Sequence, residues 1–163
     1  MTVLFYEKQR FTQWWIWVLL IGVNAVTIYG LIQQIIFKIP YGNNPSPDAV
    51  LLLVSLIPIG IAVLIYTLCL ETQITEASIT IKFYPLVRSK TIQLEEIQKV
   101  YVRQYAPIRE FGGWGYRVSL NGTAYNIRGN QGLQLELKNG KKMLIGTQRA
   151  AELQGIIEKL DMQ

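Results

Sequence analysis

The 163-residue chain has no histidine and a single cysteine, Cys69. Zinc sites draw on these two residue types, and an intrachain disulfide needs two cysteines. We therefore expect no metal site, no cofactor and no disulfide. Cys69 is interpreted as a small apolar residue, with acylation of its thiol as the alternative if that end faces the cytosol.

The sequence also lacks a recognisable catalytic motif. Glu95 and Glu96 are adjacent acids, but they have no histidine, cysteine nucleophile or third acidic residue nearby, so we interpret them as a turn between strands. The sequence therefore predicts a protein that is not an enzyme.

Charge is missing from two long stretches, residues 11–37 and 49–70, which contain no Lys, Arg, Asp or Glu. About 20 helical residues cross roughly 30 Å of hydrocarbon, so each stretch is long enough to span a membrane. The first is too long for the apolar part of a signal peptide and has no obvious Ala-x-Ala cleavage site. We predict transmembrane helices over residues 13–37 and 49–70.

A short connector, residues 38–48, joins the two helices. It contains three prolines and the turn cluster Gly42-Asn43-Asn44. At its end, Ser46 is suited to cap the second helix, Pro47 to occupy its first turn and Asp48 to complement its positive end.

The distribution of Lys and Arg predicts the orientation, because basic flanking segments stay in the cytoplasm. The connector has only Lys38, against Lys8 and Arg10 before the first helix and three basic residues between positions 82 and 90. We expect a multi-pass protein of the inner or plasma membrane with both termini cytoplasmic. The N-terminal cytoplasmic segment would be residues 1–12, and the connector would be extracytoplasmic.

Asn24 is the most polar residue in the middle of a predicted span. An amide in lipid needs a hydrogen-bond partner, so we interpret it as adhesion between the two helices through Ser55 or Thr67. The alternative is a residue that lines a substrate path. Pro58 and Gly60 are expected to bend the second helix.

From residue 71 the pattern changes to alternation with period two, which is typical of strands with one buried face. Strands are predicted over residues 72–75, 78–84, 90–94, 100–105, 116–120, 124–128, 133–137 and 142–145. The pairs Asn121-Gly122 and Asn139-Gly140 predict type I′ hairpin turns.

The final stretch changes period again. Leu153, Ile156, Ile157 and Leu160 have the spacing of one helix face, which predicts a helix over residues 148–160 that Thr147 caps. Strands followed by one amphipathic helix predict a mainly-β domain, residues 71–163. Its strongly bent antiparallel sheet or partly open barrel would be closed at one end by the helix.

Three segments carry a resemblance to known proteins: ETQITEASITIK from Glu71, SKTIQLEEIQKVYV from Ser89 and GLQLELKNGKKMLIGTQ from Gly132. With the two preceding helices, they resemble uncharacterised bacterial membrane proteins that carry a pleckstrin-homology-like (PH-like) domain. The resemblance covers residues 71–160. It implies a PH-like fold and a binding or scaffolding module, and it names no ligand.

Residues 111–117 read FGGWGYR, the most unusual local composition in the chain. Glycines permit close backbone approach, and Trp114 with Arg117 is suited to grip a partner by stacking and charge. The alternative is a mobile loop or strand bulge that Trp114 anchors against the sheet or the lipid interface. The stretch has neither the ending of a phosphate loop nor a dinucleotide fingerprint.

The region from residue 71 carries 13 Lys or Arg and 9 Asp or Glu, a balance compatible with anionic lipid beneath it. The candidate lipid or partner contacts are Arg103, Arg109, Trp114, Arg117 and Arg128, with Lys82, Arg88 and Lys90 as further basic residues. The alternative is an ordinary solvated surface. Nucleic acid is not an expected partner, because no recognition motif accompanies the charge.

Together these features predict a non-enzymatic, membrane-anchored interaction or scaffold module. It would present its β domain at the cytoplasmic membrane face, where an exposed edge or loop recruits a protein partner. A sensor of anionic lipid headgroups is the alternative, and an accessory subunit of a membrane enzyme or transporter is a more distant one. Membrane lipids and one protein are the expected partners, and self-association into a homo-oligomer stays open.

Overall fold

A computed structural model describes residues 2–161 and divides the chain into two compact units. One unit is the helical hairpin, Thr12–Thr67. The other is β-rich and is formed by the residues on both sides of that hairpin. The hairpin is therefore an insertion in the sequence of the β-rich unit.

The hairpin unit contains two helices that are long and apolar enough to cross a membrane. Helix α1 spans Trp14–Leu31 and continues as the π-helical turn η1, Ile32–Ile36; helix α2 spans Asp48–Thr67. Only 11% and 6% of their most apolar windows are buried inside the protein. Their apolar side chains therefore lack protein neighbours over most of their length.

Asn24 joins the two helices, although not through the predicted partners. Its amide nitrogen donates to the carbonyl of Leu20 in its own helix, at 2.8 Å, and to that of Pro58 across the hairpin, at 3.4 Å. Ser55 and Thr67 instead donate to carbonyls within α2. A backbone carbonyl can accept without a polar side chain facing Asn24, which is why the residue pattern could not identify it.

The connector is held by Gln34, a buried amide of η1. Its nitrogen donates to the Ser46 carbonyl and to Asp48 Oδ1, both at 2.7 Å, and its oxygen accepts the Tyr41 N–H at 3.3 Å. Ser46 thus contributes its backbone carbonyl here, and Asp48 serves as an acceptor for Gln34. Tyr41 also packs over Gly30, where a Cβ atom would meet its ring at 2.8 Å.

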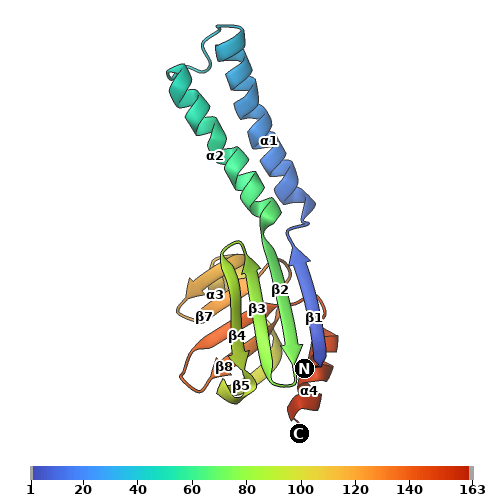
Figure 1. Cartoon of the computed structure of the whole chain (residues 1–163). Helices are drawn as coiled ribbons and strands as arrows, with labels where there is room; N and C mark the ends of the chain where they lie inside the picture. The colour runs from blue at the N-terminus through green and yellow to red at the C-terminus, as the bar shows by residue number, and fades with distance from the viewer. Residues whose placement is uncertain (1, 162–163) are drawn as a thin grey trace. The chain divides into compact units, whose positions relative to one another are not determined.

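The β-rich unit has two open sheets, and Figure 1 labels most of their strands. The first has the order β1-β2-β3-β4, with strands Val3–Arg10, Cys69–Thr75, Ser78–Tyr84 and Val87–Gln93. The second has the order β5-β8-β9-β7-β6, with β5 Ile97–Gln104, β6 Gly115–Ser119, β7 Gly122–Asn126, β8 Gln131–Leu137 and β9 Lys142–Gly146. The helical segments are η2 Leu94–Glu96, α3 Pro107–Phe111 and α4 Ala150–Asp161.

All eight predicted strands and the C-terminal helix are confirmed, with shifted ends. The predicted helical hairpin and mainly-β region are confirmed, but in place of the predicted bent antiparallel sheet or partly open barrel there are two sheets, neither is closed, and β7 pairs with β9 in parallel. The second transmembrane helix also ends earlier than residue 70, since Cys69 and Leu70 pair with both β1 and β3.

Strand β1 lies in residues 1–12, for which the sequence indicated only a cytoplasmic segment. It pairs antiparallel with β2, and Phe5, Glu7 and Gln9 are its buried side chains. Two of these three inward residues are polar, so the strand lacks the apolar alternation that signals a buried face. That composition explains why β1 was missed.

The core lies between the sheets and under α4. Its fully buried side chains include Leu70, Ile74, Ile79, Ile81 and Phe83 from the first sheet, Tyr125, Leu133, Leu135, Leu144 and Ile145 from the second, and Leu153 from α4. Phe83 and Tyr125 make ring contact between the sheets, with centroids 6.5 Å apart. Helix α4 packs on β5, β8 and β1.

The predicted type I′ turns are wrong in detail. Type I′ needs positive φ at both central residues, but among residues 2–161 only glycines and Lys38 have positive φ. Gly122 is at φ +108°, and a Cβ atom there would collide with the carbonyl oxygen of Lys142. Glycine is thus required by the close approach of the β6–β7 turn to β9.

Candidate functional site

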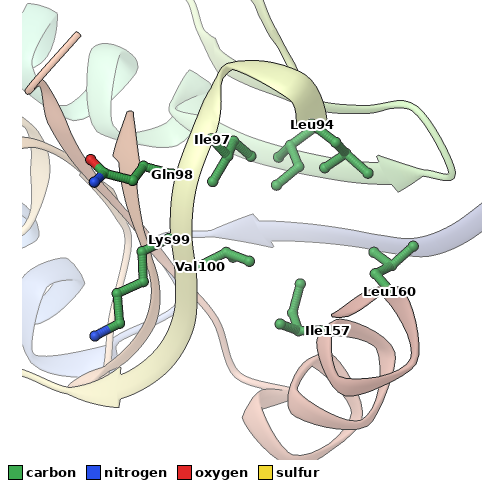
Figure 2. Close-up of a pocket in the computed structure, with 8 residues that line it drawn as sticks. Leu94, Ile97, Gln98, Lys99, Val100, Ile157 and Leu160 are labelled. Carbon is green, nitrogen blue, oxygen red and sulfur yellow. The ribbon is translucent and has the colours of Figure 1, made fainter. Parts of the chain in front are cut away.

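A groove of about 440 Å³ lies between β5, η2 and α4 in the β-rich unit. Its lining residues are Ile79, Leu94, Ile97, Gln98, Lys99, Val100, Ile157 and Leu160. Figure 2 shows Leu94, Ile97, Val100, Ile157 and Leu160 around one common space. Six of the eight lining side chains are aliphatic, so the groove is suited to an apolar group.

An irregularity in β5 places two of these side chains in the groove. Residues 97 and 100 would face opposite sides of a regular strand, because side chains alternate. The pairing of β5 with β8 shifts register between Ile97 and Lys99, and an extra residue at such a bulge resets the alternation. In Figure 2, Ile97 and Val100 accordingly point into the groove, and Gln98 and Lys99 lie on the other side of the ribbon.

Helix α4 forms the opposite wall. Of its predicted apolar stripe, Leu153 and Ile157 are buried, whereas Ile156 and Leu160 are only half-buried. The stripe is therefore wider than the surface that the sheet covers. Leu160, at its far end, faces the groove.

The groove runs along an edge strand, because among residues 2–161 β5 pairs with β8 on one side and with no strand on the other. An edge strand presents backbone N–H and C=O groups that another extended segment can pair with. The site thus combines an apolar depression with a hydrogen-bonding edge. Both features suit recognition of a peptide segment.

The other face of β5 is polar. Lys99 Nζ lies 5.2 Å from the centroid of the Tyr101 ring, and the Tyr101 hydroxyl donates to Glu136 Oε1 at 3.2 Å. Burial raises the pKa of Tyr101, and the hydrogen bond to Glu136 raises it further. Tyr101 therefore stays neutral at physiological pH and serves as a donor that ties β5 to β8.

Hydrogen bonds hold the glycine-rich stretch 111–117 in place. Trp114 Nε1 donates to the Gly129 carbonyl at 2.9 Å, Arg117 Nε donates to the Trp114 carbonyl at 3.1 Å, and the Gly115 N–H donates to Asn126 Oδ1 at 2.8 Å. These bonds match the interpretation of Trp114 as an anchor. They bring Trp114 and Arg117 together, and they tie Trp114 to the residue that follows Arg128.

Arg103 lies on β5, and Arg109 lies on α3, which packs on β6, the strand of Arg117. Arg103 is hydrogen-bonded within the chain: its guanidinium donates to Glu110 Oε2 at 2.7 Å and to Gln134 Oε1 at 3.0 Å. The hydrogen bond from Arg103 lowers the pKa of Glu110, and the Ala106 N–H acts in the same direction. Arg109 is exposed on α3.

The groove itself was not identified in the sequence. Ile97 and Val100 are three residues apart, and in a regular strand that spacing puts two residues on opposite faces. Two apolar residues at this spacing are the signal in the sequence that a bulge is present. Glu95 and Glu96 lie in η2 between β4 and β5, which confirms the predicted turn.

Among residues 2–161 no group of three or more His, Cys, Asp or Glu side chains is placed to hold a metal ion. Comparison with known family models and with curated proteins finds no match for this chain.

Proposed function

We propose that this protein is a membrane-anchored, non-enzymatic interaction module. The hairpin α1–α2 holds the β-rich unit at the cytoplasmic face of the inner or plasma membrane. The groove between β5 and α4 receives an extended, apolar segment of a partner protein. We further propose that the β-rich unit is PH-like, a fold that its two packed sheets and C-terminal helix support.

Membrane anchoring is supported by the surface of the hairpin. Residues such as Leu53 and Tyr66 of α2 have about two thirds of their side chains exposed, as do Ile21 and Leu19 of α1. Each exposed apolar side chain costs roughly 1.5–3 kcal/mol in water relative to burial. A lipid environment removes that cost along the whole length of both helices.

The groove is the observation that carries the interaction role. A partner strand beside β5 would form main-chain hydrogen bonds, and one of its apolar side chains would fill the space between Val100 and Leu160. Filling this space would add to the binding free energy, because it buries aliphatic surface of the groove and of the partner. Specificity would come from the alternate side chains of the partner strand.

The test uses a photoreactive amino acid in the full chain in its native membranes. Replacing Leu160, at the groove, with p-benzoylphenylalanine should give a discrete protein adduct on irradiation, whereas replacing Gln154, exposed on the same helix, should not. A second substitution, Val100→Trp, should fill the groove and abolish the adduct.

The matched control is Val118→Trp on β6, a strand residue that is 72% exposed and does not line the groove. It adds the same side chain and should leave the adduct at position 160 intact. Equal adducts at positions 154 and 160, or an adduct that survives Val100→Trp in a folded protein, would contradict the proposed role of the groove.

A further inference from the structure

One end of the first sheet is the end at which the chain passes to and from the helical hairpin. Arg10, the last residue of β1, pairs with Cys69, the first residue of β2, and Cys69 pairs on its other side with Tyr84 at the end of β3. The chain leaves this sheet end for the hairpin after β1 and returns at β2. The turn between β3 and β4, residues 85–86, lies at the same end.

This turn exposes apolar side chains. Tyr84 is 59% exposed and Leu86 is 55% exposed. Both lie beside Pro85, so three consecutive residues offer apolar surface at the tip of a hairpin. Tyrosine is also one of the residues that prefers the boundary between hydrocarbon and headgroups, because its ring is apolar and its hydroxyl is polar.

The two ends of the sheet have opposite charge. Arg10 and Arg88 are exposed at the end that bears the turn. Glu76, in the turn between β2 and β3, and Glu95 and Glu96, in η2 after β4, are exposed at the other end. The charges of this sheet therefore favour contact of an anionic surface with the end that bears the turn over contact with the other end.

Covalent geometry restricts how far this end can be from the membrane. Leu68 is the only residue between α2 and β2. Consecutive Cα atoms are about 3.8 Å apart, so Cys69 follows the end of α2 within roughly 8 Å. The headgroup layer on one side of a bilayer is about 5–8 Å thick. Tyr84 is the neighbour of Cys69 across one strand spacing, about 4.8 Å.

We infer that the turn Tyr84-Pro85-Leu86 is a second membrane contact, inserted among the headgroups of an anionic bilayer, with Arg10 and Arg88 placed to meet lipid phosphates. This inference rests on the proposed membrane anchoring of the hairpin. It adds a lipid-binding surface on the β-rich unit, separate from the groove between β5 and α4. The contact would fix the sheet end against the bilayer and leave the acidic end directed to the cytosol.

The experiment places an environment-sensitive fluorophore at single cysteines in the full chain, with Cys69→Ala to remove the native thiol. The chain is reconstituted in vesicles of phosphatidylcholine and phosphatidylglycerol that contain nitroxide-labelled lipids. The labelled variants are Leu86→Cys in the turn, Ala77→Cys at the opposite end of the same sheet and Leu53→Cys within α2.

The expected result is quenching at position 53 by nitroxides deep in the acyl chains, quenching at position 86 by nitroxides near the headgroups, and none at position 77. Quenching at 53 but not at 86 would overturn the turn contact and leave the membrane anchor standing. Absence of quenching at 53 would overturn both.

A charge reversal tests the basic residues. Arg88→Glu should weaken the quenching at position 86, because it places a carboxylate among lipid phosphates. The matched control is Lys138→Glu, since the Lys138 N–H donates to the Glu96 carbonyl and so lies at the opposite end. Equal quenching in both reversed variants would show that charge does not hold the turn at the bilayer and would overturn that part of the inference.

Discussion

Thr147 donates a 2.6 Å hydrogen bond from its hydroxyl to Glu7 Oε2, across 140 residues of sequence. The second oxygen of the same carboxylate accepts the Gln148 N–H at 2.9 Å. The buried carboxylate of the first strand thus satisfies donors just before the last helix. This relationship joins β1 to the segment between β9 and α4 and explains why a polar residue faces inward at position 7.

Replacing Glu7 with Leu should destabilise the β-rich unit by about 1–3 kcal/mol, because the buried Thr147 hydroxyl and Gln148 N–H lose their acceptor. The free energy of unfolding can be measured by denaturant titration of the full chain in detergent micelles. Glu76→Leu, at an exposed turn of the same sheet, is the control and should change little. Equal stability of the Glu7 variant and the wild type would contradict this role.

Asn24→Leu should weaken the association of the two hairpin helices by about 0.6–2 kcal/mol, the usual contribution of an interhelical hydrogen bond in lipid. Unfolding in increasing mole fractions of sodium dodecyl sulfate reports this energy. Thr27→Val is a suitable control, because the Thr27 hydroxyl donates only to carbonyls of its own helix. A smaller effect for Asn24 than for Thr27 would show that the contact to Pro58 contributes nothing.

Much of this architecture was readable in the sequence because its signals are continuous. The two uncharged stretches, the eight alternating segments and the stripe from Leu153 to Leu160 each repeat a pattern over many residues. Strand β1 was not readable, since Glu7 and Gln9 interrupt its apolar face and find their partners, Thr147 and the Gly146 carbonyl, at the other end of the chain.

The candidate site was less predictable for a related reason. Arg103, for example, is predicted from the sequence as a ligand contact. The fold instead brings Glu110 and Gln134 to Arg103, and they accept hydrogen bonds from its guanidinium. The groove depends on a register shift near Ile97 and on the position of α4 against β5. Both arise from tertiary packing, which a single sequence does not display.

Gly30→Val should disturb the connector of the hairpin, because the added Cβ would lie 2.8 Å from the Tyr41 ring and the ring would have to move. Tyr41 also donates its N–H to Gln34, so its displacement should loosen the segment that follows Lys38. Limited trypsin digestion in detergent should then cleave faster after Lys38. The control variant Gly22→Val should be cleaved by trypsin at the wild-type rate, since a Cβ there meets no atom within 4 Å.

The pair Arg103–Glu110 should make stability depend on pH in the acid range. Its guanidinium nitrogen and carboxylate oxygen are 2.7 Å apart, and the pKa of Glu110 is lowered, first by the hydrogen bond from Arg103. A carboxyl whose folded pKa is below its unfolded value contributes stability above the unfolded pKa and loses it as pH falls through the folded pKa.

Glu110→Gln should therefore lower the thermal midpoint at pH 7 and have a smaller effect at an acid pH below the folded pKa, where the wild-type carboxyl is protonated as well. Circular dichroism of the full chain in a nonionic detergent can follow both midpoints. Glu95→Gln, exposed in η2, provides the comparison and should follow the wild type at both pH values. An equal loss at both pH values would mean that Glu110 acts through the shape of its side chain, because only the ionised carboxylate gains from Arg103.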